Sequence, residues 1–344
     1  MEDLTALLAR VTGCPPCEVR VTLRAPLEHQ SNRLYDGWAG GRHLILKEYL
    51  KPSEFQTAPV REMRALELLA PLDVAPRPVW FEPQRPPERG PIVIYEFLEG
   101  TMWDRRRPSA VELAALAALW LKVHAVPDEP PGTLTVNNRQ LGERYATMRA
   151  GLLDFAAWTD AEFEAGRRTA DLCLQVLERG QASMRELADL QPVLCFCRSD
   201  ARFANVITRP DGRLGLVDWE DSGLRDPARE VCDLMAHPNQ EDLLEADAWQ
   251  AFLEPYFAAQ GAVDAGLRDR VRLYLGSYPV FWLSVLTMIG LGRANDGTLA
   301  GWTINELPAN TRLRRYLARA LAWPDSDFSA QLDALADVTF FPDQ

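Results

Sequence analysis

Residues 197–207 read CRSDARFANVI, and residues 216–220 read LVDWE. The first stretch places Asp200 five residues before Asn205, and the second supplies Asp218 thirteen residues after that asparagine. A Pro-Asp-Gly triplet lies between the two stretches and is typical of a turn. We therefore predict a short hairpin that holds Asn205 and Asp218 side by side at its outer ends.

These three side chains suit one kind of chemistry. Phosphoryl transfer needs a carboxylate that orients the attacking hydroxyl and accepts its proton, and it needs oxygen ligands that hold Mg²⁺ against nucleotide phosphates. Each residue alone is equally typical of a turn or a cap, because Asp and Asn side chains bond readily to nearby backbone groups. The functional interpretation therefore depends on partners elsewhere in the chain.

The first hundred residues have the patterns of a small sheet with a helix. Five strands are predicted, at residues 19–27, 34–38, 43–49, 79–81 and 92–97. The glycine pair at 40–41 indicates a hairpin turn between the second and third strands. Apolar residues recur at helical intervals over residues 60–69, and residues 4–11 also have helical spacing. We expect a lobe of five antiparallel strands and one helix that ends near residue 98.

Two charged residues of this lobe are candidate partners for the hairpin. Lys47 lies in the third predicted strand, on the face opposite to Leu46. Glu62 follows fifteen residues later, in the first turn of the predicted helix. A strand lysine alone is commonly a solvated charge, and Glu67, the nearest alternative carboxylate, lies off that helix face. We predict that Lys47 and Glu62 form a pair.

The spacing Asp-x₄-Asn, followed by a hairpin and a hydrophobic-hydrophobic-Asp run, resembles the catalytic loop of aminoglycoside phosphotransferases and their choline-kinase and protein-kinase relatives. The continuation from Asp218 to Leu234 resembles the family's D-W-E … G-D-P … D-L run. The resemblance implies an α+β, two-lobed protein-kinase-like fold. Residues 1–98 would form the nucleotide-binding lobe, and residues 99–344 a helical lobe with the catalytic loop and the acceptor site.

The resemblance also implies roles for the residues of the loop. Asp200 would be the catalytic base, Asn205 and Asp218 would be Mg²⁺ ligands, and Arg202 stands where protein kinases place a phosphate-contacting lysine. The chain departs from the family at residues 198–199, where Arg-Ser replaces the usual His-Gly. The arginine can donate hydrogen bonds that hold the loop, as that histidine does. The departure leaves a weakened or altered activity open.

In the first lobe, the resemblance implies a nucleotide site. The R-E-x-x-A-L run contains Glu62, which in the family holds the strand lysine, here Lys47, against the α- and β-phosphates. Ser31 lies in the turn between the first two strands, where its hydroxyl and nearby amides would meet phosphate. The backbone carbonyl of Glu96 and the amide of Leu98 would meet the adenine edge.

The function implied is transfer of the γ-phosphoryl group of ATP, with Mg²⁺, to a hydroxyl of a small molecule such as an aminoglycoside, an amino alcohol or a sugar. A catalytically silent nucleotide-binding protein is the alternative that the Arg-Ser departure suggests. A protein kinase ranks last, because the sequence has no G-x-G-x-x-G loop. Only seven residues separate Asp218 from Asp226, which leaves little room for an activation segment.

Composition limits the classes of partner. The 344 residues are 47% hydrophobic and 25% charged, as in ordinary globular proteins, and the formal net charge is −12. An acidic surface repels phosphate backbones, so we expect neither nucleic acid nor an anionic membrane as a partner. It is compatible with a cationic acceptor, for which Asp221 and Glu241 would be lining residues, although surface solvation accounts for them equally well. Oligomeric state leaves no sequence signal.

Beyond residue 99 the chain has mainly helical patterns. Ser109 and Glu112 have capping-box spacing, and further helices are predicted at residues 160–190, 241–260, 264–292 and 310–323. The uncharged stretch 273–292 is long enough to span a bilayer, but its proline and small polar residues favour a buried core helix.

The six cysteines indicate a reducing compartment rather than a disulfide framework. Cys14 and Cys17 have the spacing of a redox motif or half of a zinc site. A zinc site needs four ligands, and the sequence has no second CxxC motif and only four histidines. The N-terminus has no basic region followed by an apolar run, so we expect no secretory signal and a cytoplasmic protein.

Overall fold

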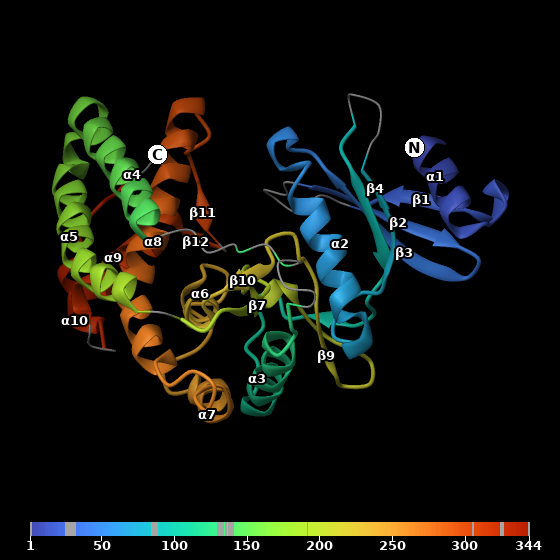
Figure 1. The fold of residues 1–344 in the computed structure, drawn as a ribbon. Helices are drawn as coiled ribbons and strands as arrows, with labels where there is room; N and C mark the ends of the chain where they lie inside the picture. The colour runs from blue at the N-terminus through green and yellow to red at the C-terminus, as the bar shows by residue number, and fades with distance from the viewer. Residues whose placement is uncertain are drawn as a thin grey trace. The chain divides into compact units, whose positions relative to one another are not determined.

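The computed structural model (Figure 1) describes residues 2–24, 32–83, 89–128, 134, 136, 141–190, 192–304, 306–323 and 327–342. The chain divides into two compact units. The first unit contains residues 1–137 and 195–225, and the second contains residues 138–194 and 226–344. The first unit therefore includes both the N-terminal sheet and the hairpin that follows residue 197. The division of roles between residues 1–98 and 99–344 stays a prediction.

A five-stranded antiparallel sheet forms the N-terminal part of the first unit, as predicted. Its strand order is β1-β2-β3-β5-β4. The strands are β1 (Arg20–Leu23), β2 (Asn32–Ala39), β3 (Arg42–Tyr49), β4 (Pro78–Glu82) and β5 (Ile92–Glu96). Gly40 and Gly41 join β2 to β3 with φ angles of 57° and 78°, which glycine adopts without a steric penalty.

The two faces of this sheet have different functions in the fold. One face carries Leu44 and Leu46 and packs against α1 (Glu2–Thr12), where Leu8 is fully buried. The approach is close, since a Cβ atom on Gly37 of β2 would lie 2.7 Å from both Leu8 and Leu46. Alternation along β3 places Lys47 on the opposite face, away from this apolar layer.

Helix α2 (Ala58–Leu69) follows β3 and contacts β4 and β5. Its buried residues include Glu62, Ala65 and Leu69, so a carboxylate lies on the same side of the helix as its apolar anchors. Helix α3 (Ala110–His124) begins at the predicted capping box, in which Ser109 accepts from the Glu112 amide and Glu112 accepts from the Ser109 amide. The start of α3 thus agrees with its predicted capping box, and α2 begins two residues before the predicted residue 60.

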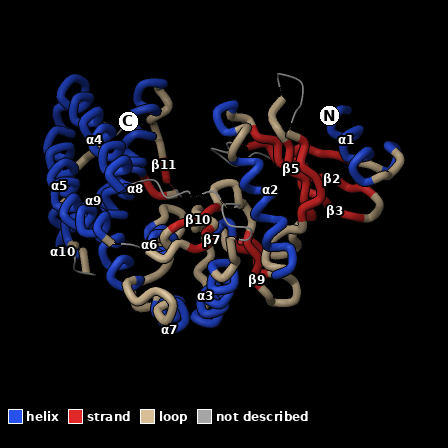
Figure 2. Tube along the Cα trace, in the orientation of Figure 1, coloured by secondary structure: helices blue, strands red, loops and turns tan. Residues whose placement is uncertain are grey.

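Short strands surround the predicted hairpin (Figure 2). Strands β6 (Thr101–Met102), β8 (Val206–Thr208) and β9 (Leu214–Leu216) form one antiparallel sheet, and β7 (Cys195–Cys197) pairs with β10 (Gly223–Arg225). Val206 pairs with Leu216 in the hairpin, and the Val217 amide donates to the Asn205 carbonyl at 3.1 Å. Asn205 and Asp218 therefore flank its outer ends, as predicted.

The second unit is mostly helical. Its elements are α4 (Leu141–Glu162), α5 (Arg167–Asp189), α6 (Pro227–Ala236), α7 (Gln250–Gln260), α8 (Leu267–Asp296), α9 (Ala309–Ala322), α10 (Ser329–Ala334), β11 (Thr303–Ile304) and β12 (Leu307–Pro308). The helix predicted at 160–190 is wrong at its start, because a 3₁₀ turn at Glu164–Gly166 separates α4 from α5. The helix predicted at 241–260 is wrong over 241–249, which form turns.

Helix α8 contains the long uncharged stretch. By length and composition it would be able to cross a membrane, yet 56% of its most apolar 18-residue window is buried inside the protein. It contacts α4, α5, α6 and α9, and Leu283 and Leu286 belong to the apolar core of this unit. Its packing is that of the core helix predicted from the sequence.

Candidate active site

Lys47 lies at the centre of a group of three carboxylates, all within the first unit. Its Nζ atom is 2.6 Å from Oδ1 of Asp218 and 2.8 Å from Oε2 of Glu62. A third carboxylate oxygen, Oε2 of Glu220, is 3.1 Å away. The lysine is buried, with 4% of its surface exposed. Strand β3, helix α2 and the hairpin therefore converge on one cation.

The predicted pair of Lys47 and Glu62 is present in the structure. Glu62 also accepts a hydrogen bond from the Tyr49 hydroxyl, and the Trp219 amide is 3.5 Å from its Oε1. Glu67 is exposed and forms an ion pair with Arg64 at 3.4 Å instead. The middle of α2, and not its last turn, supplies the carboxylate to Lys47.

Three carboxylates around one lysine leave excess negative charge. Burial alone would lower the pKa of Lys47, but the charges of Asp218 and Glu62 outweigh it and hold that pKa well above its usual range. Burial likewise opposes ionisation of Asp218, yet Lys47 and Arg202 keep its pKa low. Glu220 differs, because burial raises its pKa to about 7 despite the attraction of Lys47. Glu220 is thus the group of this cluster that is partly protonated near neutral pH.

Glu220 was missed as a site residue, although it is the last residue of the D-W-E run. Its Oε2 accepts from Nδ2 of Asn32, at the start of β2, at 2.6 Å. Its backbone carbonyl accepts from Nε of Arg61, in the first turn of α2, at 2.7 Å. Glu220 therefore connects the segment after the hairpin to the sheet and to the helix.

Asp200 lies in a loop that two donors hold in place. Nε of Arg202 donates to Oδ2 of Asp200 at 2.7 Å, and Nδ2 of Asn205 donates to the same oxygen at 3.0 Å. Burial raises the pKa of Asp200, while Arg202 and Arg198 oppose that rise. Ser199, just before it, has a φ of 80°, a conformation that turns the chain sharply between β7 and the loop. The carboxylate is oriented and has a strengthened affinity for a proton.

Two arginines join the loop to Asp218. Nη2 of Arg202 is 3.5 Å from Oδ2 of Asp218. Arg198 is almost completely buried and its Nη1 donates to the Val217 carbonyl at 3.5 Å. Arg198 therefore contacts the backbone next to Asp218, which is the loop-holding contact expected of it.

Residues 96–98, the hinge segment expected to meet the adenine edge, adjoin a cavity of about 640 Å³ within the first unit. Glu96 and Leu98 both line it, together with His43 and Phe97, whose rings stack with centroids 4.2 Å apart. The Phe97 amide donates to the His43 carbonyl, and after this bond the chain leaves the sheet. Lys47 does not line this cavity, so the hinge and the charged cluster are separate parts of the site. Ser31 lies outside the described residues.

The sheet, α2 and the hairpin define an α+β protein with a protein-kinase-like fold. The model of the phosphotransferase enzyme family matches residues 22–274, which is well over half of the chain. The chain therefore belongs to the phosphotransferase enzyme family. Comparison with curated protein sequences gives no match.

Solved structures with the same fold include kinases of small molecules. A choline/ethanolamine kinase family protein from Mesorhizobium loti is 20% identical with a TM-score of 0.60, over 97% of this chain and 99% of that one. A choline kinase from Streptococcus pneumoniae is 18% identical with a TM-score of 0.59, over 93% and 100%. A spectinomycin phosphotransferase, solved with ADP and spectinomycin, is 12% identical with a TM-score of 0.62, over 98% of both chains.

Proposed function

We propose that this protein is an ATP-dependent phosphotransferase that moves the γ-phosphoryl group to a hydroxyl of a small molecule. The observation that carries the proposal is the position of Lys47, which lies 2.8 Å from Glu62 and 2.6 Å from Asp218. Membership of the phosphotransferase enzyme family supports phosphoryl transfer as the reaction. The names of the similar structures support an amino alcohol, an aminoglycoside or a related sugar-like molecule as the acceptor class.

In this proposal the first unit binds the nucleotide. Lys47 would contact the α- and β-phosphates while Glu62 fixes its position. The carbonyl of Glu96 and the amide of Leu98 would bind the adenine edge, next to the cavity that both residues line. Ser31 would add a hydroxyl to the phosphates.

Asn205 and Asp218 would hold Mg²⁺, and their donor atoms fit that ion. Mg²⁺ prefers carboxylate and amide oxygens, and the hairpin ends bring one of each together. Nδ2 of Asn205 donates to Asp200, which supports the carboxamide oxygen as the ligand of a cation. When bound, the ion would neutralise charge on the phosphate oxygens.

Asp200 would act as the base. The acceptor hydroxyl oxygen would attack the γ-phosphorus, the bond from that phosphorus to the β–γ bridging oxygen would break, and ADP would leave. The hydroxyl proton would pass to Asp200, whose raised pKa favours its uptake. Arg202 holds Asp200 at 2.7 Å and would also stabilise charge on the transferred group.

An ADP-release screen tests the proposal. Purified protein with ATP and Mg²⁺ is offered amino alcohols, aminoglycosides and sugars, and we expect at least one class to stimulate ADP release. The Arg-Ser pair at 198–199 favours one competing function, a silent nucleotide-binding protein. Such a protein would bind ATP and release no ADP with any acceptor, and that result would reject the proposal.

The remaining parts of the proposal concern partners and location. The net charge of −12 suits a cationic acceptor and disfavours nucleic acid and anionic membranes. None of the six cysteines forms a disulfide, which is consistent with a cytoplasmic protein.

A further inference from the structure

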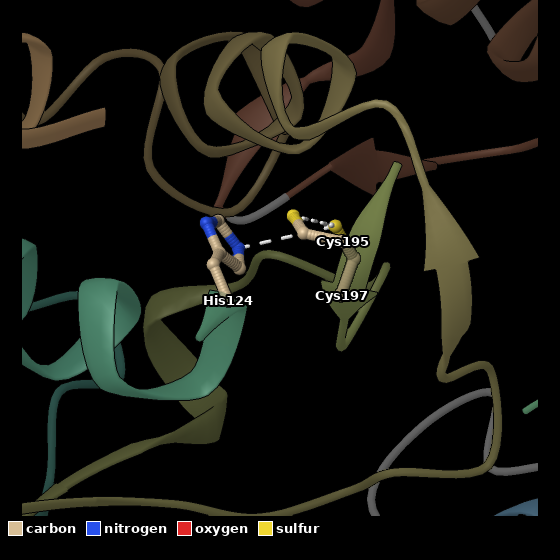
Figure 3. A group of neighbouring side chains, drawn as sticks. All are labelled: His124, Cys195 and Cys197. Atoms are coloured by element: carbon tan, nitrogen blue, oxygen red, sulfur yellow. Dashed lines mark hydrogen bonds between the residues drawn. The ribbon is translucent and has the colours of Figure 1, made fainter. Parts of the chain in front are cut away.

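A histidine and two cysteines, none of which has a part in the proposed phosphoryl transfer, converge inside the first unit (Figure 3). Cys195 and Cys197 lie two residues apart on β7, so their side chains point to the same face of the strand. His124, the last residue of α3, points toward them. All three residues are buried, and their ligand atoms lie within 4.8 Å of one another.

The distances match those between ligands of one small metal ion. The two sulfur atoms are 3.6 Å apart, and Sγ of Cys197 is 3.9 Å from Nε2 of His124. Tetrahedral zinc bonds of about 2.3 Å to sulfur and about 2.0 Å to nitrogen place two sulfurs about 3.8 Å apart and a sulfur and a nitrogen about 3.6 Å apart. For these two pairs a Zn²⁺ ion would need shifts of only a few tenths of an ångström. The third pair, Cys195 and His124, lies within 4.8 Å and would close around the ion.

A disulfide does not explain the cysteine pair as well. Residues two apart on a strand have Cα atoms about 6.6 Å apart, which is near the upper limit of about 6.8 Å for a disulfide. The sulfurs would also have to approach from 3.6 Å to about 2.05 Å, and a bond would leave His124 without a part in the cluster. Metal binding, by contrast, uses all three side chains.

Charge favours the same conclusion. A buried site is stable when its charges cancel. Two thiolates and a neutral imidazole balance the charge of one Zn²⁺ ion, and thiolate with imidazole is a ligand set that zinc prefers. Three protein ligands are also the number found in zinc sites that keep a fourth position for a small ligand.

We propose that His124, Cys195 and Cys197 bind one Zn²⁺ ion. The ion would fasten the end of α3 to β7, and the residue after β7 is Arg198, which contacts the backbone beside Asp218. The site would thus stabilise the base of the loop that carries Asp200. The proposal does not rest on the proposed phosphotransferase function, because metal binding is measured without nucleotide or acceptor.

Cobalt titration tests the site. The reduced, full-length protein is stripped with a chelator and titrated with Co²⁺, whose bonds to thiolate give an intense near-ultraviolet charge-transfer absorption that carboxylate ligands do not give. We expect the band to saturate at one equivalent and to disappear when Zn²⁺ is added. Cys195→Ser and Cys197→Ser are expected to lose the band, and His124→Gln to weaken Zn²⁺ binding by more than about 100-fold.

The chain offers matched controls. The double variant Cys14→Ser/Cys17→Ser removes the other close cysteine pair, and Cys173→Ser removes a buried thiol outside the cluster. Both should keep the band. A band that survives in Cys195→Ser, or that vanishes in the Cys14→Ser/Cys17→Ser variant, would overturn the proposal, as would the lack of any band in the wild-type protein.

A second measurement tests the site in the wild-type protein, so that its result does not depend on whether the variants fold. In the wild-type protein, one equivalent of Zn²⁺ should raise the thermal midpoint. It should also slow alkylation of the peptide that contains Cys195 and Cys197, relative to the peptide that contains Cys173, as read by mass spectrometry. Equal alkylation of the two peptides with and without Zn²⁺ would reject the site without any substitution.

Discussion

Replacement of Glu62 by glutamine tests the central geometry most directly. The change keeps the size of the side chain and removes the charge that lies 2.8 Å from Lys47. Removing one partner of a buried ion pair typically costs about 3–5 kcal/mol. Lys47 keeps two other carboxylates, at 2.6 Å and 3.1 Å, so we expect the loss to be smaller, at about 1–2 kcal/mol.

The loss should appear as a change in catalysis rather than in folding alone. Without Glu62, Lys47 is drawn toward Asp218 and Glu220, away from the phosphates that it is proposed to contact. A loss of about 1–2 kcal/mol corresponds to a decrease of about 5- to 30-fold in kcat/KM for ATP. The assay is steady-state ADP release over a range of ATP concentrations, with the best acceptor from the screen held constant.

Glu67→Gln is the matched control for this substitution. It removes a carboxylate from the same helix, but Glu67 is exposed and its partner, Arg64, lies 3.4 Å away. Exposed pairs of this kind contribute little, so kcat/KM should stay within about twofold of the wild-type value. Equal kcat/KM values for the two variants would refute the idea that the buried pair positions Lys47.

Three further predictions concern other parts of the first unit. Asp200→Asn should lower kcat by about 10² to 10⁴-fold and leave ATP affinity unchanged; full activity in this variant would disprove the assignment of the base. Burial raises the pKa of Glu220 to about 7 from a usual 4.5. The free energy of unfolding should therefore fall as pH rises from 4.5 to about 7 and stay constant above that pH. Glu220→Gln should remove this loss, which is about 3 kcal/mol at most. The thermal midpoints of this variant at about pH 5 and about pH 8 should then differ less than those of the wild-type protein. An unchanged difference would contradict the assignment of this pH dependence to Glu220. Ser109→Ala removes the cap of α3 and should lower the free energy of unfolding by about 1 kcal/mol, measured by urea denaturation, whereas no change would show that Glu112 alone holds this helix end.

The sheet and the hairpin were predictable because their signals are local. Strand alternation, a glycine pair and a Pro-Asp-Gly triplet each act within a few residues, and the structure has the corresponding elements within two residues of the expected bounds. The exception is β1, which ends at Leu23 and not at the expected residue 27. Lys47 and Glu62 were also predictable, since a strand and the helix that follows it leave few ways for the two charges to meet.

The missed elements depend on contacts between distant parts of the chain. Helix α4 buries Met148, Leu152, Phe155 and Thr159, which have helical spacing, but a threonine and the neighbouring Gly151 weaken the apolar pattern. Glu241 was read as a pocket or surface residue. In the structure its side chain is fully buried and forms ion pairs with Arg312 and with Arg319, the latter at 2.7 Å.

The charges around Lys47 explain how the same side chains can be stable in the free protein and still bind a nucleotide. A buried cation and its carboxylates must compensate one another. Lys47 is compensated by Asp218 and Glu62, while Glu220, with a pKa of about 7, is only partly ionised near neutral pH. The same atoms are the ones proposed to meet phosphate and Mg²⁺, so binding would exchange the contact between Lys47 and Asp218 for contacts with ligand charges of the opposite sign. Such an exchange changes partners without leaving either buried charge uncompensated, and this requires Lys47 and Asp218 to begin in direct contact, as they do here at 2.6 Å.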